Sequence, residues 1–155
     1  MDDFKANFAP RVMQETERRQ KRNLSNLGGW IRLAAKRSIK SVGRRSTRGA
    51  AFLGNSGEIV SRPGYPPLNK TGYLREFLFA ACEKDNVVIG VAKLNRKSAG
   101  VPEALEFGGK VIVNVGRGVK QHPEARHILP RPFMRPALAR AQKRKIFEYF
   151  WKDSN

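Results

Sequence analysis

The spacing of apolar residues predicts a long helix in the first quarter of the chain. A narrow stripe with helical spacing runs through Leu27, Ile31, Ala34, Ala35, Ser38 and Val42. We expect this helix to span residues 8–42, with Asn7 as its N-cap and Pro10 in its first turn. Gly28 and Gly29 each cost about 1 kcal/mol relative to alanine, so a kink or a split is expected there.

Residues 43–72 show no helical or strand periodicity and are rich in Gly, Ser, Arg and Pro. A loop of this length without secondary structure is unusual inside a compact domain and is usually functional or disordered. We therefore interpret residues 43–72 as an extended arm or loop. A neighbouring subunit is expected to hold it in place.

Short apolar runs after residue 72 predict strands at 73–82 and 87–92, joined by a turn at Glu83–Asn86. The inward side chains of the first strand are expected to be Leu74, Phe77 or Leu78, and Phe79. Those of the second strand are expected to be Val87, Ile89 and Val91.

The last third of the chain mixes helix and strand signals. A short helix is predicted at Val101–Phe107, with Gly108 just past its end, followed by a strand at Lys110–Val115. Gly116–Gly118 should end that strand, and residues 119–130 are expected to form a loop or a ragged return strand. A final helix is predicted at 132–151, with Phe133, Ala137 and Ala141 on one face. The fold class is therefore α+β. We expect one domain over residues 1–155, in which a small antiparallel β-sheet is flanked by a long N-terminal helix and a C-terminal helix.

Charge changes this picture, because 31 Lys and Arg residues face 13 Asp and Glu residues, a net of +18. Residues 11–48 hold twelve basic residues against Glu15 and Glu17, a net of +10. Residues 126–152 hold eight against Glu148, a net of +7. The simplest interpretation is that these charges solvate two helices, but the excess is larger than solubility requires. The stretch with least apolar surface provides four candidate interface residues: Arg18, Arg19, Lys21 and Arg22.

Catalytic chemistry is weakly represented. His122 and His127 flank Glu124, but they lie five residues apart rather than the four of a metalloprotease helix, and a solvated loop is the expected setting. Cys82 is the only cysteine, which excludes an internal disulfide and indicates a small core residue. No glycine-rich phosphate loop is present. We expect neither enzymatic activity nor a cofactor or metal.

Membrane and export signals are also weak. The longest apolar run, Phe77–Cys82, has six residues, whereas roughly 20 are needed to cross a bilayer. The chain begins Met1-Asp2-Asp3, which is acidic where a signal peptide would be basic. We expect no membrane partner and a cytoplasmic site of synthesis.

Three segments in a fixed order carry a family resemblance: Arg62–Leu74 (RPGYPPLNKTGYL), Ala104–Gly109 (ALEFGG) and Arg131–Leu138 (RPFMRPAL). Together the three segments resemble the phage neck and tail-completion family, also called minor tail protein Z-like or virion morphogenesis proteins. The resemblance covers roughly residues 60 to 145. Family members often carry Thr after Glu-Phe-Gly, where this chain has Gly109.

The resemblance implies a structural virion protein in a ring around the DNA channel at the head–tail junction. Its partners would be copies of itself, in a hexamer or dodecamer, and neighbouring connector, head-closure or tail-terminator and tube proteins. The protein would reside in the virion, and in the host cytoplasm during assembly. Non-specific contact with DNA is a further expected interaction.

Aromatic residues and prolines provide the remaining candidate interface positions, which are Tyr65, Pro66, Pro67, Tyr73, Tyr149 and Trp151. The proline loop fits either an interface or a rigid cover over its own sheet edge. The aromatic residues at 147 and 149–151 cannot all face one core. Some should meet another chain, unless the tail folds back over the N-terminal helix near Trp30. Glu106 is expected to pair with Arg131 or Arg135, and Phe107 to lie in the core.

A basic nucleic-acid-binding protein is the alternative function. The net charge favours it, but the Lys and Arg clusters lack the interleaved aromatic residues of a base-stacking surface. No zinc-finger, RNA-recognition or KH signature is present. The identity of neighbouring genes would discriminate well between the two functions.

Overall fold

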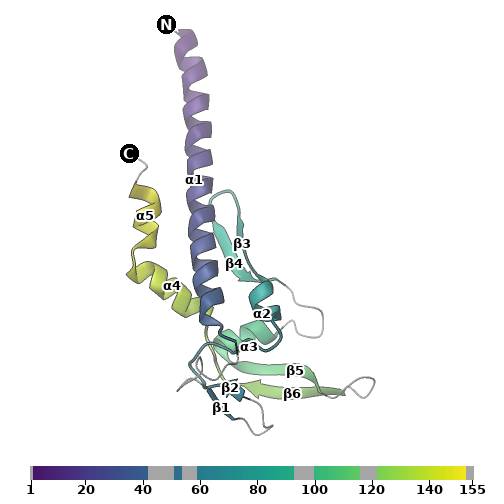
Figure 1. The fold of residues 1–155 in the computed structure, drawn as a ribbon. Coiled ribbons are helices and arrows are strands. Elements are labelled where there is room, and N and C mark those ends of the chain that lie inside the picture. The colour runs from purple at the N-terminus through teal and green to yellow at the C-terminus, as the bar shows by residue number, and fades with distance from the viewer. Residues whose placement is uncertain (1, 42–50, 54–58, 93–99, 116–121, 153–155) are drawn as a thin grey trace.

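The computed structural model describes residues 2–41, 51–53, 59–92, 100–115 and 122–152, and these form an α+β fold (Figure 1). A long N-terminal helix, small antiparallel sheets and a helical C-terminal end are present, as the sequence predicted. In chain order the elements are α1 (Asp2–Ser38), β1 (Ala51–Leu53), β2 (Ile59–Ser61), α2 (Tyr73–Glu76), β3 (Leu78–Cys82), β4 (Val87–Val91), α3 (Val101–Phe107), β5 (Gly109–Val115), β6 (His122–Ile128), α4 (Met134–Lys143) and α5 (Ile146–Lys152).

The strands form three separate two-stranded antiparallel sheets rather than one sheet. β1 pairs with β2, β3 with β4, and β5 with β6, and none of these described strands bonds to a further strand. Helices cover two of the ribbons instead, since α1 packs on β3 and β4, and α3 packs on β5. An isolated two-stranded ribbon is marginally stable, so these two ribbons depend on the helices that pack on them.

α1 extends further towards the N-terminus than predicted and ends earlier. It begins at Asp2, so Asn7 is not its N-cap and Pro10 lies inside the helix rather than in its first turn. It ends at Ser38, whose hydroxyl donates to the Ala35 carbonyl over 2.7 Å. The chain then turns aside, because the carbonyl of Lys40 accepts a hydrogen bond from the backbone N–H of Asn69 (2.8 Å). This pairing with a distant loop explains why the helix does not reach residue 42.

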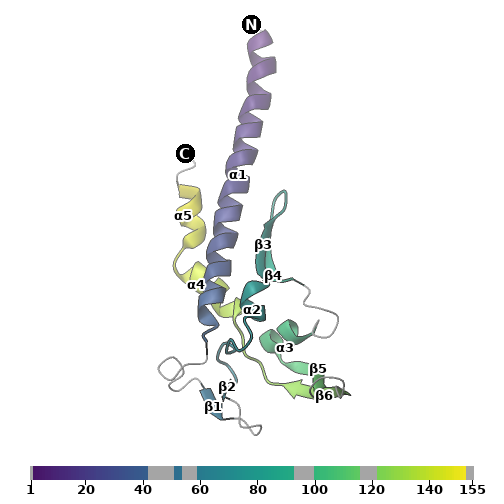
Figure 2. The same ribbon diagram turned by 45° about the vertical axis from the view of Figure 1, so that its right-hand side comes forward.

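The core lies between the C-terminal half of α1, the β3–β4 ribbon and α4. α4 and α5 lie on one side of α1 and the β3–β4 ribbon on the other, in both views (Figure 2). Four residues of the predicted stripe, Leu27, Ile31, Ala34 and Ala35, supply the α1 side of this core together with Ile39, which the stripe did not include. Ser38 is only half-buried, and Val42 lies outside the described residues. Phe133, Ala137 and Ala141 supply the α4 side, as expected. The buried residues of this cluster are Leu27, Ile31, Ala34, Ala35, Ile39, Leu78, Phe133, Ala137 and Ala141.

Gly28 allows α1 and β4 to approach closely, and α1 is one continuous helix through Gly28 and Gly29. A Cβ atom at Gly28 would lie 2.5 Å from Cγ2 of Val87 and 3.4 Å from Cβ of Ala80. At Gly29 nothing lies within 4 Å of such an atom. The glycine pair therefore serves helix–ribbon packing rather than a kink.

Gly28→Ala is expected to destabilise the fold, whereas Gly29→Ala, its matched control, should stabilise it. Both changes gain up to about 1 kcal/mol of helix propensity. At Gly28 the overpacking penalty of about 1–3 kcal/mol outweighs this gain, because Val87 is β-branched and has few alternative rotamers. Urea unfolding of the two variants measures the difference. Equal stabilisation by both would contradict the close approach of β4.

The segment before β3 differs from its predicted form. Residues Tyr73–Glu76 form the helical turn α2 instead of a strand, after Gly72 at a φ of 89°. The strand therefore starts at Leu78, which is fully buried, and Phe79 faces outward with 51% of its surface exposed. The prediction that Phe79 lies in the core is wrong. The turn at Glu83–Asn86 is confirmed by the bond from the Glu83 N–H to the Asn86 carbonyl (2.9 Å).

The β3–β4 register places one face of the ribbon against α1. Leu78 pairs with Val91, Ala80 with Ile89, and Cys82 with Val87, so these six residues share a face. Val87, Ile89 and Val91 are partly buried on it, as predicted. Cys82 is half-buried there rather than fully in the core.

The region around α3 follows the prediction more closely. α3 spans Val101–Phe107, and Gly108 has a φ of 79°, so the positive φ expected after this helix is present. β5 begins at Gly109, one residue before the predicted start. Of the two forms predicted for residues 119–130, a loop or a ragged return strand, the structure shows the strand: His122–Ile128 pairs along its length with β5. Phe107 is 63% exposed, so its predicted place in the core is wrong.

The C-terminal helix is divided into α4 and α5, where the sequence predicted one helix over 132–151. Lys145, between them, has a φ of 52°, a left-handed conformation that cannot continue a right-handed helix. The break turns α5 along α1, so that Ile146 and Phe150 pack against the core. The two residues share a side at i, i+4 as predicted.

The arm contains more pairing than its sequence indicated. Ala51–Leu53 and Ile59–Ser61 form the β1–β2 ribbon. The other parts of the predicted arm before β2, at 43–50 and 54–58, lie outside the described residues. So does the predicted break at Gly116–Gly118. The role of a neighbouring subunit in ordering the arm stays a prediction.

Candidate interaction surface

The N-terminal half of α1 projects beyond the rest of the fold (Figures 1 and 2). Of residues Pro10–Arg22, which we call the free half of α1, all are exposed except Gln20, which is half-buried. The buried stripe of α1 begins only at Leu27. The free half therefore adds little to the core and is available for contacts.

The free half of α1 carries five exposed basic side chains that form no ion pair among the described residues. Arg18, Arg19, Lys21 and Arg22, the four residues selected from the sequence, are all exposed, and Arg11 joins them one helical turn from Glu15. None of the five forms an ion pair with a carboxylate in the part of the chain that the structure describes. Such a surface attracts polyanions or acidic proteins, and the attraction weakens as salt screens it.

The four predicted cations do not form one patch. Arg19 lines a hollow that faces the end of α5, whereas Lys21 lines a hollow beside the β3–β4 turn, with Glu83 and Asp85. Their positions follow from the 3.6-residue helical repeat, which turns neighbouring residues to different sides. Basic residues that are consecutive in the sequence are therefore distributed around the circumference of the helix.

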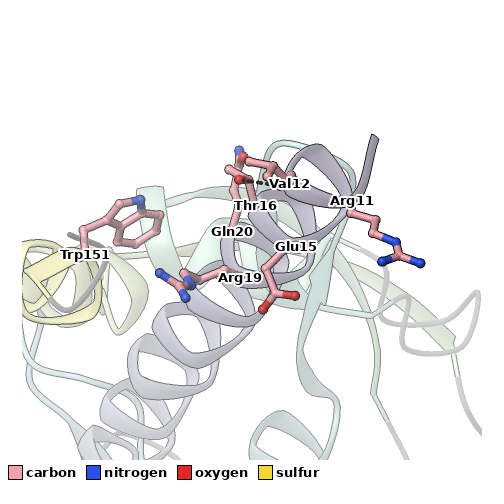
Figure 3. Close-up of a pocket in the computed structure, with 7 residues that line it drawn as sticks. All are labelled: Arg11, Val12, Glu15, Thr16, Arg19, Gln20 and Trp151. Carbon is pink, nitrogen blue, oxygen red and sulfur yellow. Dashed lines mark hydrogen bonds between the residues drawn. The ribbon is translucent and has the colours of Figure 1, made fainter. Parts of the chain in front are cut away.

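The end of α5 and the free half of α1 enclose an open groove of about 570 Å³ (Figure 3). Trp151 faces across it towards α1, and Arg19 points into the space between them. Thr16 donates its hydroxyl hydrogen to the Val12 carbonyl over 2.8 Å, which satisfies this polar group within α1. We call this hollow the α1–α5 groove; it is lined by Arg11, Val12, Glu15, Thr16, Arg19, Gln20 and Trp151.

The C-terminal aromatic residues separate into buried and exposed members. Phe150 packs against the core, as does Trp30 of α1, so the tail folds back over the N-terminal helix. Phe147, Tyr149 and Trp151 remain exposed, and the Tyr149 ring contacts Phe150 edge-on at a centroid distance of 5.4 Å. The fold-back of the tail is thus observed for Phe150, whereas contact of the exposed rings with another chain stays a prediction.

The proline segment Arg62–Leu74, which we call the strap, connects distant parts of the chain through backbone hydrogen bonds. The Gly64 N–H donates to the Pro130 carbonyl over 2.8 Å, while Asn69 bonds to the end of α1. Pro67 is buried and Pro66 is half-buried within the subunit; an interface role and a rigid cover over a sheet edge both stay predictions for this loop. The rings of Tyr65 and Tyr73 are exposed, so these two residues remain candidates for an interface.

Glu106 joins α3 to the start of α4. Its buried carboxylate accepts three backbone hydrogen bonds, from the N–H groups of Phe133 (2.9 Å), Met134 (3.0 Å) and Arg135 (2.8 Å). The Arg135 guanidinium lies 3.6 Å from the same carboxylate and 4.7 Å from the centre of the Phe107 ring. We call this arrangement the Glu106 junction. The predicted pairing with Arg135 is therefore confirmed, and the backbone contacts were not foreseen.

Arg131 serves a different partner from the one predicted for it. Its Nε donates to the Ser61 carbonyl over 2.9 Å, and its backbone N–H donates to the Leu105 carbonyl. Burial lowers the pKa of the Arg131 guanidinium from its ordinary value. Arg131 thus ties β2 and α3 to the segment before α4, and it does not pair with Glu106.

The histidines and the glutamate of β6 lie at or near the surface. His122, Glu124 and His127 lie on β6, and Glu124 pairs with Arg126 at 3.2 Å. Within the described ranges, no group of three or more His, Cys, Asp or Glu side chains is arranged to hold a metal ion. Among the helices of these ranges, none has the length and apolar character needed to cross a bilayer.

Comparison of the chain with protein-family models, with curated proteins and with solved structures gave no match.

Most of the α1–α5 groove was missed by the sequence analysis. Arg19 and Trp151 were selected, but Arg11, Val12, Glu15, Thr16 and Gln20 were not. A weak signal existed, because Val12 and Thr16 lie one turn apart and share a side of a helix. Nothing in the sequence indicated that Trp151 would lie opposite them, since that depends on the break at Lys145.

Proposed function

We propose that this protein is a structural virion protein of a tailed bacteriophage. It would form part of the neck at the head–tail junction, in a tail-completion or tail-terminator ring around the DNA channel. The protein would carry out no catalysis. Its function would be assembly, in which folded subunits dock and their arms become ordered.

The main support is that the three segments carrying the family resemblance meet at one place in the fold. The strap at Arg62–Leu74 bonds through Gly64 to Pro130, just before the third segment. Ala104–Gly109 supplies Glu106, whose carboxylate holds the start of α4 in the third segment. A Cβ atom at Gly108 would lie 3.1 Å from Cδ of Pro130. Residues placed together for packing and hydrogen bonding favour a structural role over a catalytic one.

The proposed partners are other copies of the chain in a ring and neighbouring connector, head-closure or tail-terminator and tube proteins. Ring contacts are heterologous, so one face of the subunit must complement a different face of the next. The free half of α1 and the exposed rings of Tyr65 and Tyr73 are the candidate contact regions. The protein would reside in the virion, after assembly in the host cytoplasm.

A nucleic-acid-binding protein is the second candidate. The observation that favours it is the set of unpaired cations on the free half of α1. In a neck ring the same cations would contact DNA non-specifically or face acidic protein.

DNA binding by the purified protein is expected to be weak and without sequence preference. It should collapse between low and physiological salt, because it depends on counterion release alone. A fluorescence-anisotropy salt series with several defined duplexes and a random duplex measures this. Sequence-selective binding that survives physiological salt, with a Kd near 10⁻⁸ M or tighter, would favour the nucleic-acid-binding function instead.

A separate test of the assembly function reverses the charge at Arg18, Arg19, Lys21 and Arg22. These residues are exposed and contribute no buried surface, so unfolding in urea should change little. Joining of heads to tails, scored as infectious particles after mixing, should fall strongly. Unchanged joining by a folded variant would contradict a contact role for this surface in the neck.

A further inference from the structure

The α1–α5 groove combines an apolar wall with a basic rim. Trp151, 40% exposed at the end of α5, provides a large apolar surface with an indole N–H. Val12 faces the same space from α1 and is also exposed. Arg11 and Arg19 both line the hollow with Glu15 between them; Arg19 points towards Trp151, whereas the Arg11 guanidinium points away from Trp151 (Figure 3). Exposed aromatic and arginine side chains around a hollow are typical of a protein-binding site.

The charge around this groove selects an acidic occupant. Arg11 and Arg19, and their neighbours Arg18 and Arg22, lack carboxylate partners within the described chain. A second copy of this chain is poorly suited to the groove, because its net charge is +18 and its acidic residues are few. The complementary ligand is therefore an acidic chain of a different protein.

The shape of the groove favours a peptide segment over DNA. A hollow of about 570 Å³ can take a few side chains, but it is too small to admit a duplex. A phosphodiester backbone has no apolar side chain to pack against Trp151, whereas a peptide segment can supply one. A glutamate-rich or aspartate-rich segment with one or two apolar side chains could pair with the arginines of the rim and pack against the apolar wall.

We propose that the α1–α5 groove docks an acidic segment of a partner protein. An apolar side chain of the segment packs between Trp151 and Val12, while its carboxylates pair with Arg11 and Arg19. This inference deepens the assembly function proposed above and rests on it for its biological setting. It identifies the chemistry of the partner that the free half of α1 would meet.

The test uses the purified full chain and three fluorescein-labelled probes. The first probe is a short peptide of glutamates with leucines one helical turn apart. The second has serine in place of each leucine, and the third is a random DNA duplex. At physiological salt the leucine peptide should bind at least about tenfold more tightly than the serine peptide, because only leucine fills the apolar wall.

Variants locate the binding site. Trp151→Ala should weaken the leucine peptide about tenfold and leave the serine peptide and the duplex within about twofold. Arg19→Glu should weaken both peptides, and it removes no buried contact, so it remains informative if Trp151→Ala folds poorly. Arg62→Glu makes the same change in net charge at an exposed loop position outside the groove, and should alter peptide binding by less than about twofold.

Two results would overturn the inference. One is equal binding of the leucine and serine peptides, which would mean charge attraction without docking. The other is a loss of duplex binding in Trp151→Ala as large as the loss of peptide binding, which would indicate a nucleic-acid surface.

Failure of this inference differs from failure of the neck assignment. Peptide binding is measured on the isolated chain, whereas the neck role is measured by joining of heads to tails. A chain that binds the leucine peptide through Trp151 but is dispensable for joining would refute the neck role and leave the groove assignment intact.

Discussion

Glu106→Ala is expected to cost about 3–5 kcal/mol of unfolding free energy, because it removes a buried charged acceptor and leaves three backbone N–H donors without that partner. The side chain of Glu106 is 8% exposed. It accepts the backbone N–H groups of Phe133, Met134 and Arg135 at the start of α4, where no side chain of α4 itself provides a cap. Its negative charge also suits the positive end of the α4 dipole. Urea unfolding followed by circular dichroism measures the loss.

Two further variants measure separately the contribution of the negative charge of Glu106 and that of its ion pair with Arg135. Glu106→Gln keeps one acceptor oxygen and should lose about 1.5–3 kcal/mol, since hydrogen bonds to a charged group are stronger. Arg135→Ala should cost less than about 1 kcal/mol, because the Arg135 side chain is 62% exposed and its pairing is screened.

Glu103→Ala is the matched control for this junction. Glu103 lies one turn earlier on α3, is exposed, and should change stability by no more than about 0.5 kcal/mol. If Glu106→Ala were as mild as Glu103→Ala, the carboxylate would not hold α4.

Leu78→Ala should be the second large loss, about 2–5 kcal/mol, whereas Phe79→Ala should lose less than about 1 kcal/mol. Leu78 is fully buried against α1 and α4, and Phe79 is on the opposite face of β3. The two residues are neighbours, so the pair tests the register of the strand directly. A larger loss at Phe79 than at Leu78 would mean that β3 is shifted by one residue, which would exchange its two faces.

The sequence predicted those elements whose signals are local. The apolar stripe of α1, the helix between Pro102 and Gly108, and the turn at Glu83–Asn86 each follow from spacing or from turn-forming residues. Phe133, Ala137 and Ala141 were expected on one face, and they are buried together against α1. In these cases the residues that set the conformation lie within the element itself.

Other features depend on contacts that sequence spacing does not reveal. Phe77, Leu78 and Phe79 are all apolar, so their pattern does not indicate which of them faces the core; α2 decides it by delaying the start of β3. The break at Lys145 occurs without glycine or proline, because α5 gains packing on α1 when the helix turns. The end of α1 at Ser38 is likewise set by a partner loop.

The candidate surface was predictable only in part. The cations of the free half follow from composition and from the lack of nearby apolar residues. The α1–α5 groove does not, since it requires Trp151 to lie beside residues more than a hundred positions earlier. Glu106 was expected to be an ion-pair partner, but its hydrogen bonds to the backbone of α4 depend on how α3 and α4 meet in the fold, which the sequence does not reveal.

The division of α1 into a buried half and a free half has an evolutionary consequence. In the proposed docking role, substitutions at Arg11, Arg18 or Arg22 would alter what the helix binds, and they lie away from the packing around Leu27 and Ile31. Stability and the proposed recognition would then be encoded in separate turns of one continuous helix. A lineage whose partner protein changes can adjust the free turns by single substitutions, while selection for a folded subunit acts on the others. Divergence should accordingly be fastest in the first two dozen residues.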